Sequence, residues 1–263
     1  MQFSLDLGSV PYNLPEYVSP SSLSTFQQCP LKYKFSRLDK LPSEPTEAQV
    51  LGSFVHEILE ELFGYDPNDR TLTVARAVAR KLWSDKWNAE FDQLKVKSSV
   101  NDFRWQSWWC VENYFAMEDP TIFQPNGIEV KVDGIIGGAP VLGIVDRWHL
   151  EDNGIVVSDY KTGKKPNAKY EWEKKLQITM YCILLSEQTG FDINRAELLY
   201  LKSARYATYE ISNELIDTVT ENVSETWVQI GKMCESGVFD TKVGPLCNWC
   251  DYKNICPAWV KND

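Results

Sequence analysis

The chain has 263 residues, of which 43% are hydrophobic and 24% are charged, and its formal net charge is −10. This is the composition of an ordinary globular protein, and a chain of this length can bury roughly three quarters of its unfolded surface. The acidic balance argues against a protein that coats nucleic acid nonspecifically, but a nucleic-acid enzyme with a local positive groove stays possible.

Residues 1–18 contain two prolines and little hydrophobic periodicity, which predicts an extended arm. They lack a basic region followed by an apolar core, so we expect no signal peptide. No apolar run in the chain approaches the roughly 20 residues of a membrane span. We therefore expect a cytoplasmic protein, either of a bacterial cell or encoded by a phage and acting in its host.

The next segment predicts a helix over about 21–37. The sequence Ser19-Pro20-Ser21-Ser22 supplies hydroxyl caps and a proline near the first turn, as helix starts commonly do. Cys29 is followed directly by Pro30, which is expected to interrupt this helix.

A further helix is predicted over 47–64, because its apolar residues recur with a helical period. Gly52, His56 and Glu60 share another face of this helix. The glycine would let another part of the chain approach closely, and His56 could present its imidazole there. A satisfied structural histidine is the alternative.

Residues 70–118 predict two helices with many aromatic side chains and interleaved lysine and arginine. Such rings could stack on bases and line a channel for a single strand. Helical spacing of aromatic residues is more often that of a core, so we expect most of them to be buried. They are Trp83, Trp87, Phe91, Phe103, Trp105, Trp108, Trp109, Tyr114 and Phe115.

A short strand is predicted at 128–132, and residues 143–164 predict a strand, a turn and a second strand. Asp146 falls in the first strand of this hairpin. Asp159 and Lys161 close the second strand and, being two residues apart, point to the same face. Two carboxylates and a lysine on one side of a hairpin could hold a hard cation and an attacking water. A solvated edge with a surface salt bridge is the alternative.

A long helix is predicted over about 169–189, with Gln177 and Tyr181 on one face. A second hairpin at 195–211 and an amphipathic helix at 213–236 follow.

The window 159–175 carries six lysines against three acids and is the most basic stretch beside the proposed site. Its Lys164 and Lys165 could contact a nucleic acid, although a solvated helix face would explain the outer lysines equally well.

Three cysteines, Cys247, Cys250 and Cys256, crowd into ten residues near the C-terminus. In a reducing compartment such spacing favours metal or cluster ligation over disulfides. A tetrahedral site needs a fourth thiolate, and Cys29, also followed by proline, is the best candidate; zinc and a [4Fe–4S] cluster both fit. The remaining cysteines are expected to be small apolar residues of helices: Cys110, Cys182 and Cys234.

Together these features resemble the RecB-like branch of the PD-(D/E)XK nuclease superfamily, and most closely its iron–sulfur members, the Cas4 family and the AddB-type nuclease domain. The resemblance runs from Ser19 to Pro257. The matching motifs, in the family's order, are the opening that ends in Cys29-Pro30, GxxxH at Gly52–His56, GxxD at Gly143–Asp146, (D/E)xK at Asp159–Lys161, QxxxY at Gln177–Tyr181 and the C-terminal cysteine triplet.

The resemblance implies a single nuclease domain with a mixed central β-sheet flanked by helices and a helical insertion. Its parts would be an N-terminal arm with the first cluster cysteine (1–46), a helical region (47–126), the catalytic sheet (127–211) and a C-terminal helix with the cluster loop (212–263).

The resemblance also implies residue roles. His56, Asp146, Asp159 and the backbone carbonyl of Tyr160 would bind Mg²⁺ or Mn²⁺. Lys161 would orient or deprotonate the attacking water, and Gln177 and Tyr181 would position the DNA strand or Lys161. Glu129 and Glu60 would lie around the ligands, and the four cysteines would hold a [4Fe–4S] cluster.

We therefore expect a metal-dependent DNA nuclease, an exonuclease on single-stranded DNA or DNA ends, acting in recombination, repair or CRISPR adaptation. A helicase or integrase-type protein is a candidate partner, and any unwinding motor would be a separate chain, because this chain contains no Gly-rich phosphate loop. The alternatives are a DNA-end-binding subunit with a vestigial nuclease centre and a zinc-stapled structural protein.

Overall fold

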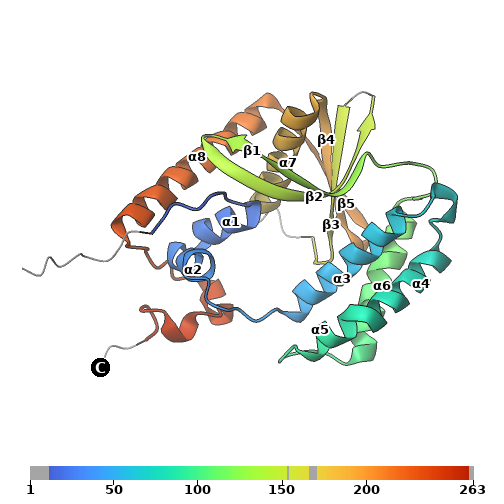
Figure 1. The fold of residues 1–263 in the computed structure, drawn as a ribbon, viewed down its shortest axis with the longest axis horizontal. Coiled ribbons are helices and arrows are strands. Elements are labelled where there is room, and N and C mark those ends of the chain that lie inside the picture. Colours follow the sequence, from blue (N-terminus) through green and yellow to red (C-terminus); the bar gives the residue numbers. More distant parts are fainter. Residues whose placement is uncertain (1–11, 153, 166–170, 261–263) are drawn as a thin grey trace, which may run out of the picture. The chain divides into compact units, whose positions relative to one another are not determined.

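A computed structural model of the chain describes residues 12–152, 154–165 and 171–260 (Figure 1). The start of the predicted arm, Asn153 of the predicted turn and the predicted beginning of the long helix at 169 lie outside these residues. None of the described helices is both long and apolar enough to cross a membrane.

The chain forms two compact units. One consists of Met1–Ser43, Asp133–Leu142 and Asp217–Asp263, and the other of Glu44–Val132 and Gly143–Ile216. We call the first the terminal unit and the second the sheet unit.

A mixed five-stranded sheet is the centre of the fold, as predicted. Its strands follow each other in chain order, with β2 antiparallel to β3, β3 parallel to β4 and β4 antiparallel to β5. The parallel pair is joined by helix α7 (Trp172–Thr189), because parallel strands need a long crossover connection. The strands are β1 (Gly127–Ile136), β2 (Ala139–Glu151), β3 (Gly154–Lys161), β4 (Asp192–Tyr200) and β5 (Arg205–Glu210). The first strand is longer than predicted, and only Gly137 and Gly138 turn the chain, both with positive φ.

Helices cover both faces of β3. Tyr160 of β3 and Leu199 of β4 belong to a core shared with the helical region, while α7 packs on the same two strands. Every residue from Gly154 to Tyr160 is buried, as expected for a parallel strand covered on both sides. A polar side chain at the end of this strand is therefore held by a rigid environment.

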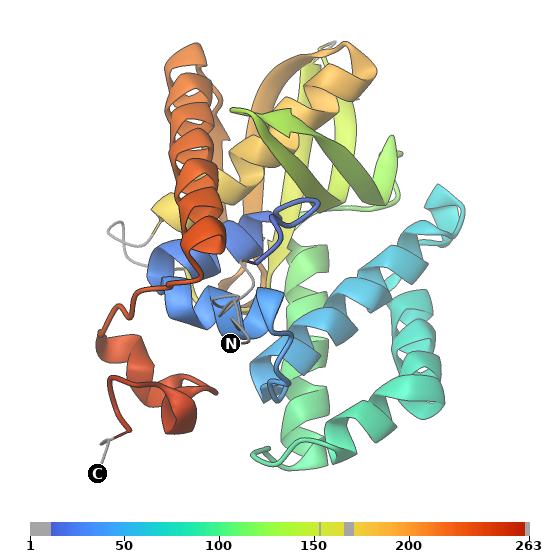
Figure 2. The same cartoon turned by 60° about the vertical axis from the view of Figure 1, so that its left-hand side comes forward.

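The helical region of the sheet unit contains α3 (Glu47–Phe63), α4 (Leu72–Leu82), α5 (Asn88–Asp92) and α6 (Val100–Met117), with α3, α4 and α6 packed on one another (Figure 2). Thr46 and Gln49 form a capping box that starts α3. The expectation of an aromatic core is confirmed for five rings, whereas Trp105 and Trp109 are exposed. The buried rings are those of Trp83, Trp87, Phe91, Phe103 and Tyr114.

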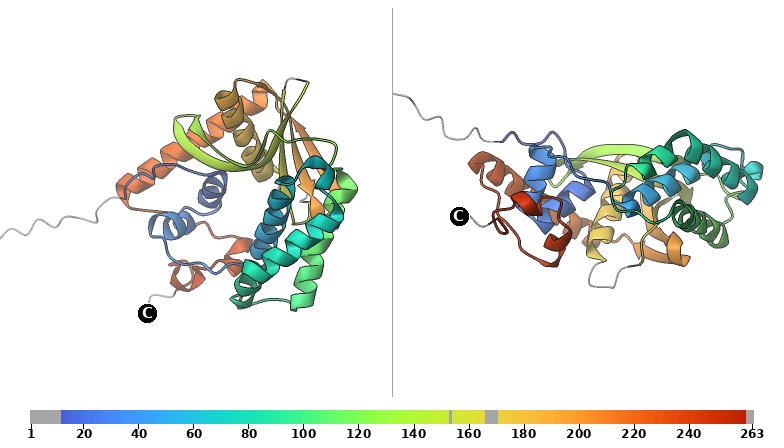
Figure 3. Two further views of the ribbon diagram at one scale, coloured as in Figure 1. Left: turned by 45° about the vertical axis from the view of Figure 1, so that its right-hand side comes forward. Right: turned by 90° about the horizontal axis from the view of Figure 1, so that it is seen from below.

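The terminal unit joins a segment from before the sheet to a segment from after it. Helix α1 (Pro20–Gln28) ends before Pro30, which begins the short α2 (Pro30–Tyr33), so the predicted interruption is confirmed. The side chain of Gln27 donates hydrogen bonds to Asn222 and Thr226 of α8 (Asn213–Ser236). After α8, two short 3-10 turns, η6 (Pro245–Trp249) and η7 (Lys253–Ile255), contain most of the cysteine-rich segment (Figure 3).

Candidate active site

The predicted hairpin brings Asp146 and the end of β3 together. Arg147 pairs with Ser158 in the antiparallel register of β2 and β3. Asp146 Oδ2 accepts a hydrogen bond of 2.7 Å from the backbone N–H of Tyr160. The surface alternative is wrong for these carboxylates, because Asp146 is 8% exposed and Asp159 is 2% exposed.

Helix α3 carries His56 to this hairpin. Its apolar residues, including Phe54 and Ile58, are buried in the helical core, which fixes the direction of the histidine face. His56 Nε2 lies 3.0 Å from the carbonyl oxygen of Tyr160. Gly52 permits this approach, since a Cβ there would meet Thr162 Oγ1 at 3.2 Å.

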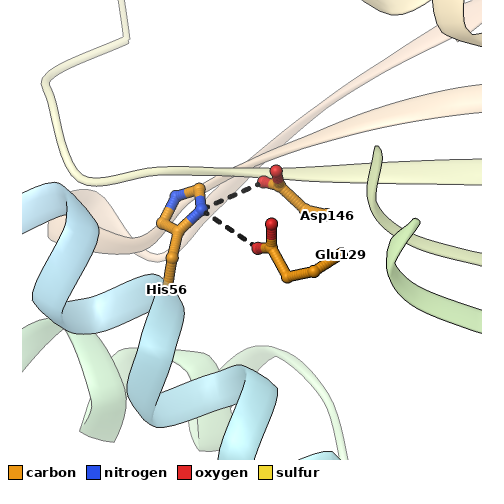
Figure 4. Close-up of side chains that lie close together, drawn as sticks. All are labelled: His56, Glu129 and Asp146. Atoms are coloured by element: carbon orange, nitrogen blue, oxygen red, sulfur yellow. Dashed lines mark ion pairs between the residues drawn. The ribbon is translucent and has the colours of Figure 1, made fainter. Parts of the chain in front are cut away.

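Glu129 lies closer to the site than the sequence predicts. Its Oε1 is 3.7 Å from His56 Nδ1, and Asp146 Oδ2 is 3.5 Å from the same nitrogen (Figure 4). His56, Glu129 and Asp146 each offer one ligand atom within 4.8 Å of the others, and these three could hold a metal ion. Glu129 has a φ of 47°, a left-handed backbone conformation that is rare inside a strand. Such strain costs on the order of 1–3 kcal/mol and is common at functional sites, where it redirects a side chain.

The electrostatics of this group favour a cation. Burial, together with the charge of Asp159, raises the pKa of Asp146 to about 7. Burial lowers the pKa of His56, but Asp146, Glu129 and Asp159 outweigh it and raise that pKa to about 9. The raised pKa values show that the carboxylates of Asp146, Glu129 and Asp159 attract positive charge, and a divalent metal ion between them would stabilise their ionised forms.

Asp159 pairs with the lysine of its own motif. Its Oδ2 is buried and lies 2.5 Å from Lys161 Nζ, without hydrogen-bond geometry. Lys161 Nζ also donates to Gln177 Oε1 at 3.3 Å, and Gln177 Nε2 donates to the hydroxyl of Tyr181 at 3.1 Å. The structure thus joins the QxxxY and (D/E)xK motifs in one chain of contacts, which runs from Tyr181 through Gln177 to Lys161.

Tyr181 depends on the glycine of the GxxD motif. A Cβ at Gly143 would lie 2.5 Å from Cε1 of the Tyr181 ring, so only glycine leaves room for the ring. Tyr181 is 6% exposed, and burial raises the pKa of its hydroxyl. Its position favours a role in holding Gln177 and Lys161 over direct contact with DNA.

Arg147 was not among the predicted residues, yet it anchors the hairpin. It is 1% exposed, forms an ion pair with Glu118 through both terminal nitrogens, and donates to Ser158 Oγ at 2.9 Å. Ser158, immediately before Asp159, therefore accepts a hydrogen bond from Arg147. An arginine in an apolar strand was the available signal, but its partner Glu118, which directly follows α6, is not visible in the sequence.

The remaining predicted residues of the sheet unit lie nearer the surface. Lys164 and Lys165 are exposed just after β3, and Lys165 lies 3.9 Å from Glu171. Glu60 is exposed on α3. Lys174, on the face of α7 that carries Gln177, is half-buried, and its pKa is lowered by burial and by the charge of Lys161.

The four predicted cluster cysteines all belong to the terminal unit and are half-buried. Their segments contact each other: the N–H of Leu31 donates to the carbonyl of Asp240 at 3.1 Å, and Lys242 Nζ donates to the carbonyl of Gln27 at 2.8 Å. The side chains concerned are Cys29, Cys247, Cys250 and Cys256. The other three cysteines are buried in helices as predicted.

Comparisons with known proteins agree with this geometry. A family model described as the PD-(D/E)XK nuclease superfamily matches residues 17–257. The "Gene 69 protein" of Mycobacterium phage D29 is 21% identical over 273 residues, covering 92% of this chain and 96% of the phage protein. The CRISPR-associated exonuclease Cas4 of Francisella tularensis subsp. novicida is 31% identical over 120 residues, covering 43% of this chain and 55% of that protein.

A solved structure shares the fold. The crystal structure of a protein of Eubacterium rectale, described as a candidate exonuclease, superposes with a TM-score of 0.61 at 15% sequence identity. The match covers 99% of this chain and 97% of that one. At 15% sequence identity, this similarity shows the fold alone.

Proposed function

Because the chain belongs to the PD-(D/E)XK nuclease superfamily, it is a nuclease, and we propose that it is a Mg²⁺- or Mn²⁺-dependent deoxyribonuclease acting on single-stranded DNA or DNA ends. The observation that carries this proposal is the convergence of His56, Glu129 and Asp146 within 4.8 Å, beside the pair of Asp159 and Lys161. One imidazole and several carboxylates suit Mg²⁺ or Mn²⁺ better than zinc. The similarity to the CRISPR-associated exonuclease Cas4 of Francisella supports an exonuclease.

Different residues of the site would bind the metal and position the attacking water. His56, Glu129, Asp146 and the buried Oδ2 of Asp159 would hold the metal, which supplies a positive charge for the scissile phosphate and lowers the pKa of water. Lys161 is held by Asp159 and Gln177, so its Nζ is positioned to orient the attacking water and to offset charge developing on the phosphate. The carbonyl of Tyr160 lies against His56 and fixes the orientation of its ring.

We further propose that Cys29, Cys247, Cys250 and Cys256 bind a [4Fe–4S] cluster that staples the two ends of the terminal unit. The support is their common unit and the hydrogen bonds between their segments. Among the described residues the four cysteines form no group with ligand atoms within 4.8 Å of one another, as a single zinc ion would require. Cys250→Ala should lose absorbance near 400 nm and thermal stability, whereas Cys234→Ala should keep the absorbance. A colourless wild-type protein that binds zinc through these thiols would refute the cluster.

An assay on DNA labelled at either end tests the nuclease. Wild-type protein with Mg²⁺ or Mn²⁺ should shorten single-stranded DNA, and the product lengths over time would give the polarity. Lys161→Ala and Asp146→Asn should lose at least about 100-fold in rate while keeping their fold by circular dichroism. Wild-type cleavage by either variant would refute the assigned site.

A DNA-end-binding subunit without cleavage is the second candidate. The intact set of His56, Asp146, Asp159 and Lys161 counts against it, since binding alone does not need all four. DNA binding without metal-dependent cleavage by freshly purified protein would favour it.

A helicase or integrase-type protein as partner also stays a proposal, which co-purification from the host would test.

A further inference from the structure

Two tryptophans of α6 form an exposed stacked pair. Trp105 is 63% exposed and Trp109 is 42% exposed. Their ring centroids are 5.4 Å apart and their planes differ by 14°, so the rings are nearly parallel. Residues four apart on a helix lie on the same face, which explains the stacking. Two adjacent tryptophans left in solvent contrast with the buried aromatic core of the same helical region.

Positive charge flanks this pair. Arg104 precedes Trp105 and Gln106 follows it, and they lie on its two sides around the helix, since neighbouring residues are about 100° apart. Arg104 is exposed, and Gln106 Oε1 accepts a hydrogen bond of 3.2 Å from the exposed Lys202.

The nearby carboxylates are occupied within α6 and its surroundings. Asp102 accepts a hydrogen bond from Ser99 at the start of α6, and Glu112 lies 3.6 Å from Arg76. The charge of Glu112 is thus offset by Arg76, whereas the hydroxyl of Ser99 leaves the charge of Asp102 in place. The attraction of this surface for a negatively charged strand therefore rests on Arg104 and Lys202.

The pair is also connected to the catalytic edge of the sheet. Tyr200 at the end of β4 pairs with Lys161 at the end of β3. The next residues form the 3-10 turn η5 (Leu201–Ser203), which packs on α6, where Asn113 Nδ2 donates to the carbonyl of Leu201 at 2.7 Å. Lys202 thus lies two residues beyond the partner of the catalytic lysine and contacts the residue next to Trp105.

We propose that Trp105 and Trp109 form a stacking platform for the bases of a DNA single strand that extends from the active site across η5. This inference rests on the proposed function for the identity of the strand. Aromatic rings stack on any base, so the platform would bind without sequence preference, while Arg104 and Lys202 attract the phosphates. It would hold the part of the substrate that is not being cleaved.

Binding to a labelled oligonucleotide of about 20 nucleotides, measured by fluorescence anisotropy in EDTA, tests the platform without cleavage. Each tryptophan replaced by alanine should weaken binding roughly 5-fold or more. The paired Trp→Phe substitutions should retain most of the affinity. Val96→Ala removes another exposed apolar side chain of the helical region, which is 87% exposed, and should leave binding unchanged.

An abasic oligonucleotide separates stacking from a general structural effect. Wild-type protein should prefer the normal strand to the abasic strand, and Trp105→Ala/Trp109→Ala should lose that preference. Wild-type affinity of this double variant, or an equal loss for both strands, would overturn the platform. A change from dimer to monomer in light scattering with unchanged DNA binding would also overturn it, because the rings would then join two copies of the chain.

Shortening the oligonucleotide should reduce the difference in cleavage rate between the wild type and the double variant, because a shorter strand makes fewer contacts outside the active site. If the wild type cleaves nothing, the proposed nuclease fails, whereas the anisotropy experiment still decides on the platform.

Discussion

Gly143→Ala should disturb the active site without touching a catalytic group. The added Cβ would lie 2.5 Å from Cε1 of Tyr181, about 1 Å closer than ordinary van der Waals contact allows. Overpacking of this kind costs about 1–3 kcal/mol, and the reduced freedom of the unfolded chain returns about 0.4–1 kcal/mol. We therefore expect the free energy of unfolding to fall by about 1–2 kcal/mol, measured by urea denaturation.

The same displacement should reach Lys161, because the Tyr181 hydroxyl accepts from Gln177 and Gln177 accepts from Lys161. A shift of about 1 Å at a catalytic group can cost roughly 100-fold in rate. The assay is metal-dependent cleavage of single-stranded DNA at saturating metal. Gly163→Ala is the matched control, since a Cβ there would meet nothing within 4 Å.

A double-mutant cycle decides whether the ring is the cause. In a Tyr181→Ala background the Cβ at position 143 has no ring to meet, so Gly143→Ala should cost little further stability. Wild-type stability and cleavage of Gly143→Ala, or an undiminished cost in the background without the ring, would refute this reasoning.

Three further predictions follow from the same geometry. The raised pKa values of Asp146 (about 7) and His56 (about 9) mean that both hold protons more tightly in the folded state, so the metal-free protein should lose thermal stability as the pH rises through these values. His56→Gln should flatten this loss in the upper part of the range, and an unchanged pH profile would contradict the assignment. Glu129→Gln should weaken Mn²⁺ binding, measured by calorimetry without DNA, roughly 10-fold or more, whereas equal affinity would remove Glu129 from the ligands. Glu118→Gln should destabilise the protein by about 3 kcal/mol in urea, because it leaves Arg147 buried with its charge unpaired; a loss below about 1 kcal/mol would show that water reaches that charge.

Most of the fold and the centre of the site could be predicted from local pattern. Asp159 and Lys161 share a face because side chains alternate along a strand. The helical period placed His56 on a different face of its helix from the apolar residues. The spacing of Gln177 and Tyr181 likewise predicted that they act together, and their hydrogen bond confirms that they are in contact.

Other features depend on information that no local pattern carries. The left-handed backbone of Glu129 breaks the alternation of its strand, so counting residues could not place its carboxylate beside His56. The helical period could not separate Trp105 and Trp109 from the buried rings of the same segment, because exposure depends on which helix packs against which face. The ion pair of Arg147 with Glu118 joins residues that are distant in sequence.

The division of the chain into two units has a consequence for its synthesis. Besides Asp133–Leu142, the terminal unit combines residues before Glu44 with residues after Ile216, and the whole sheet unit is translated between these two segments. At 5–20 residues per second, Cys29 emerges roughly 10–40 s before Cys247. A nascent chain that has not yet reached Cys247 therefore lacks three of the four proposed cluster ligands. Cluster insertion would then wait until Cys247, Cys250 and Cys256 have been translated, and a bound cluster would mark a chain that contains both the early and the late segments of the terminal unit.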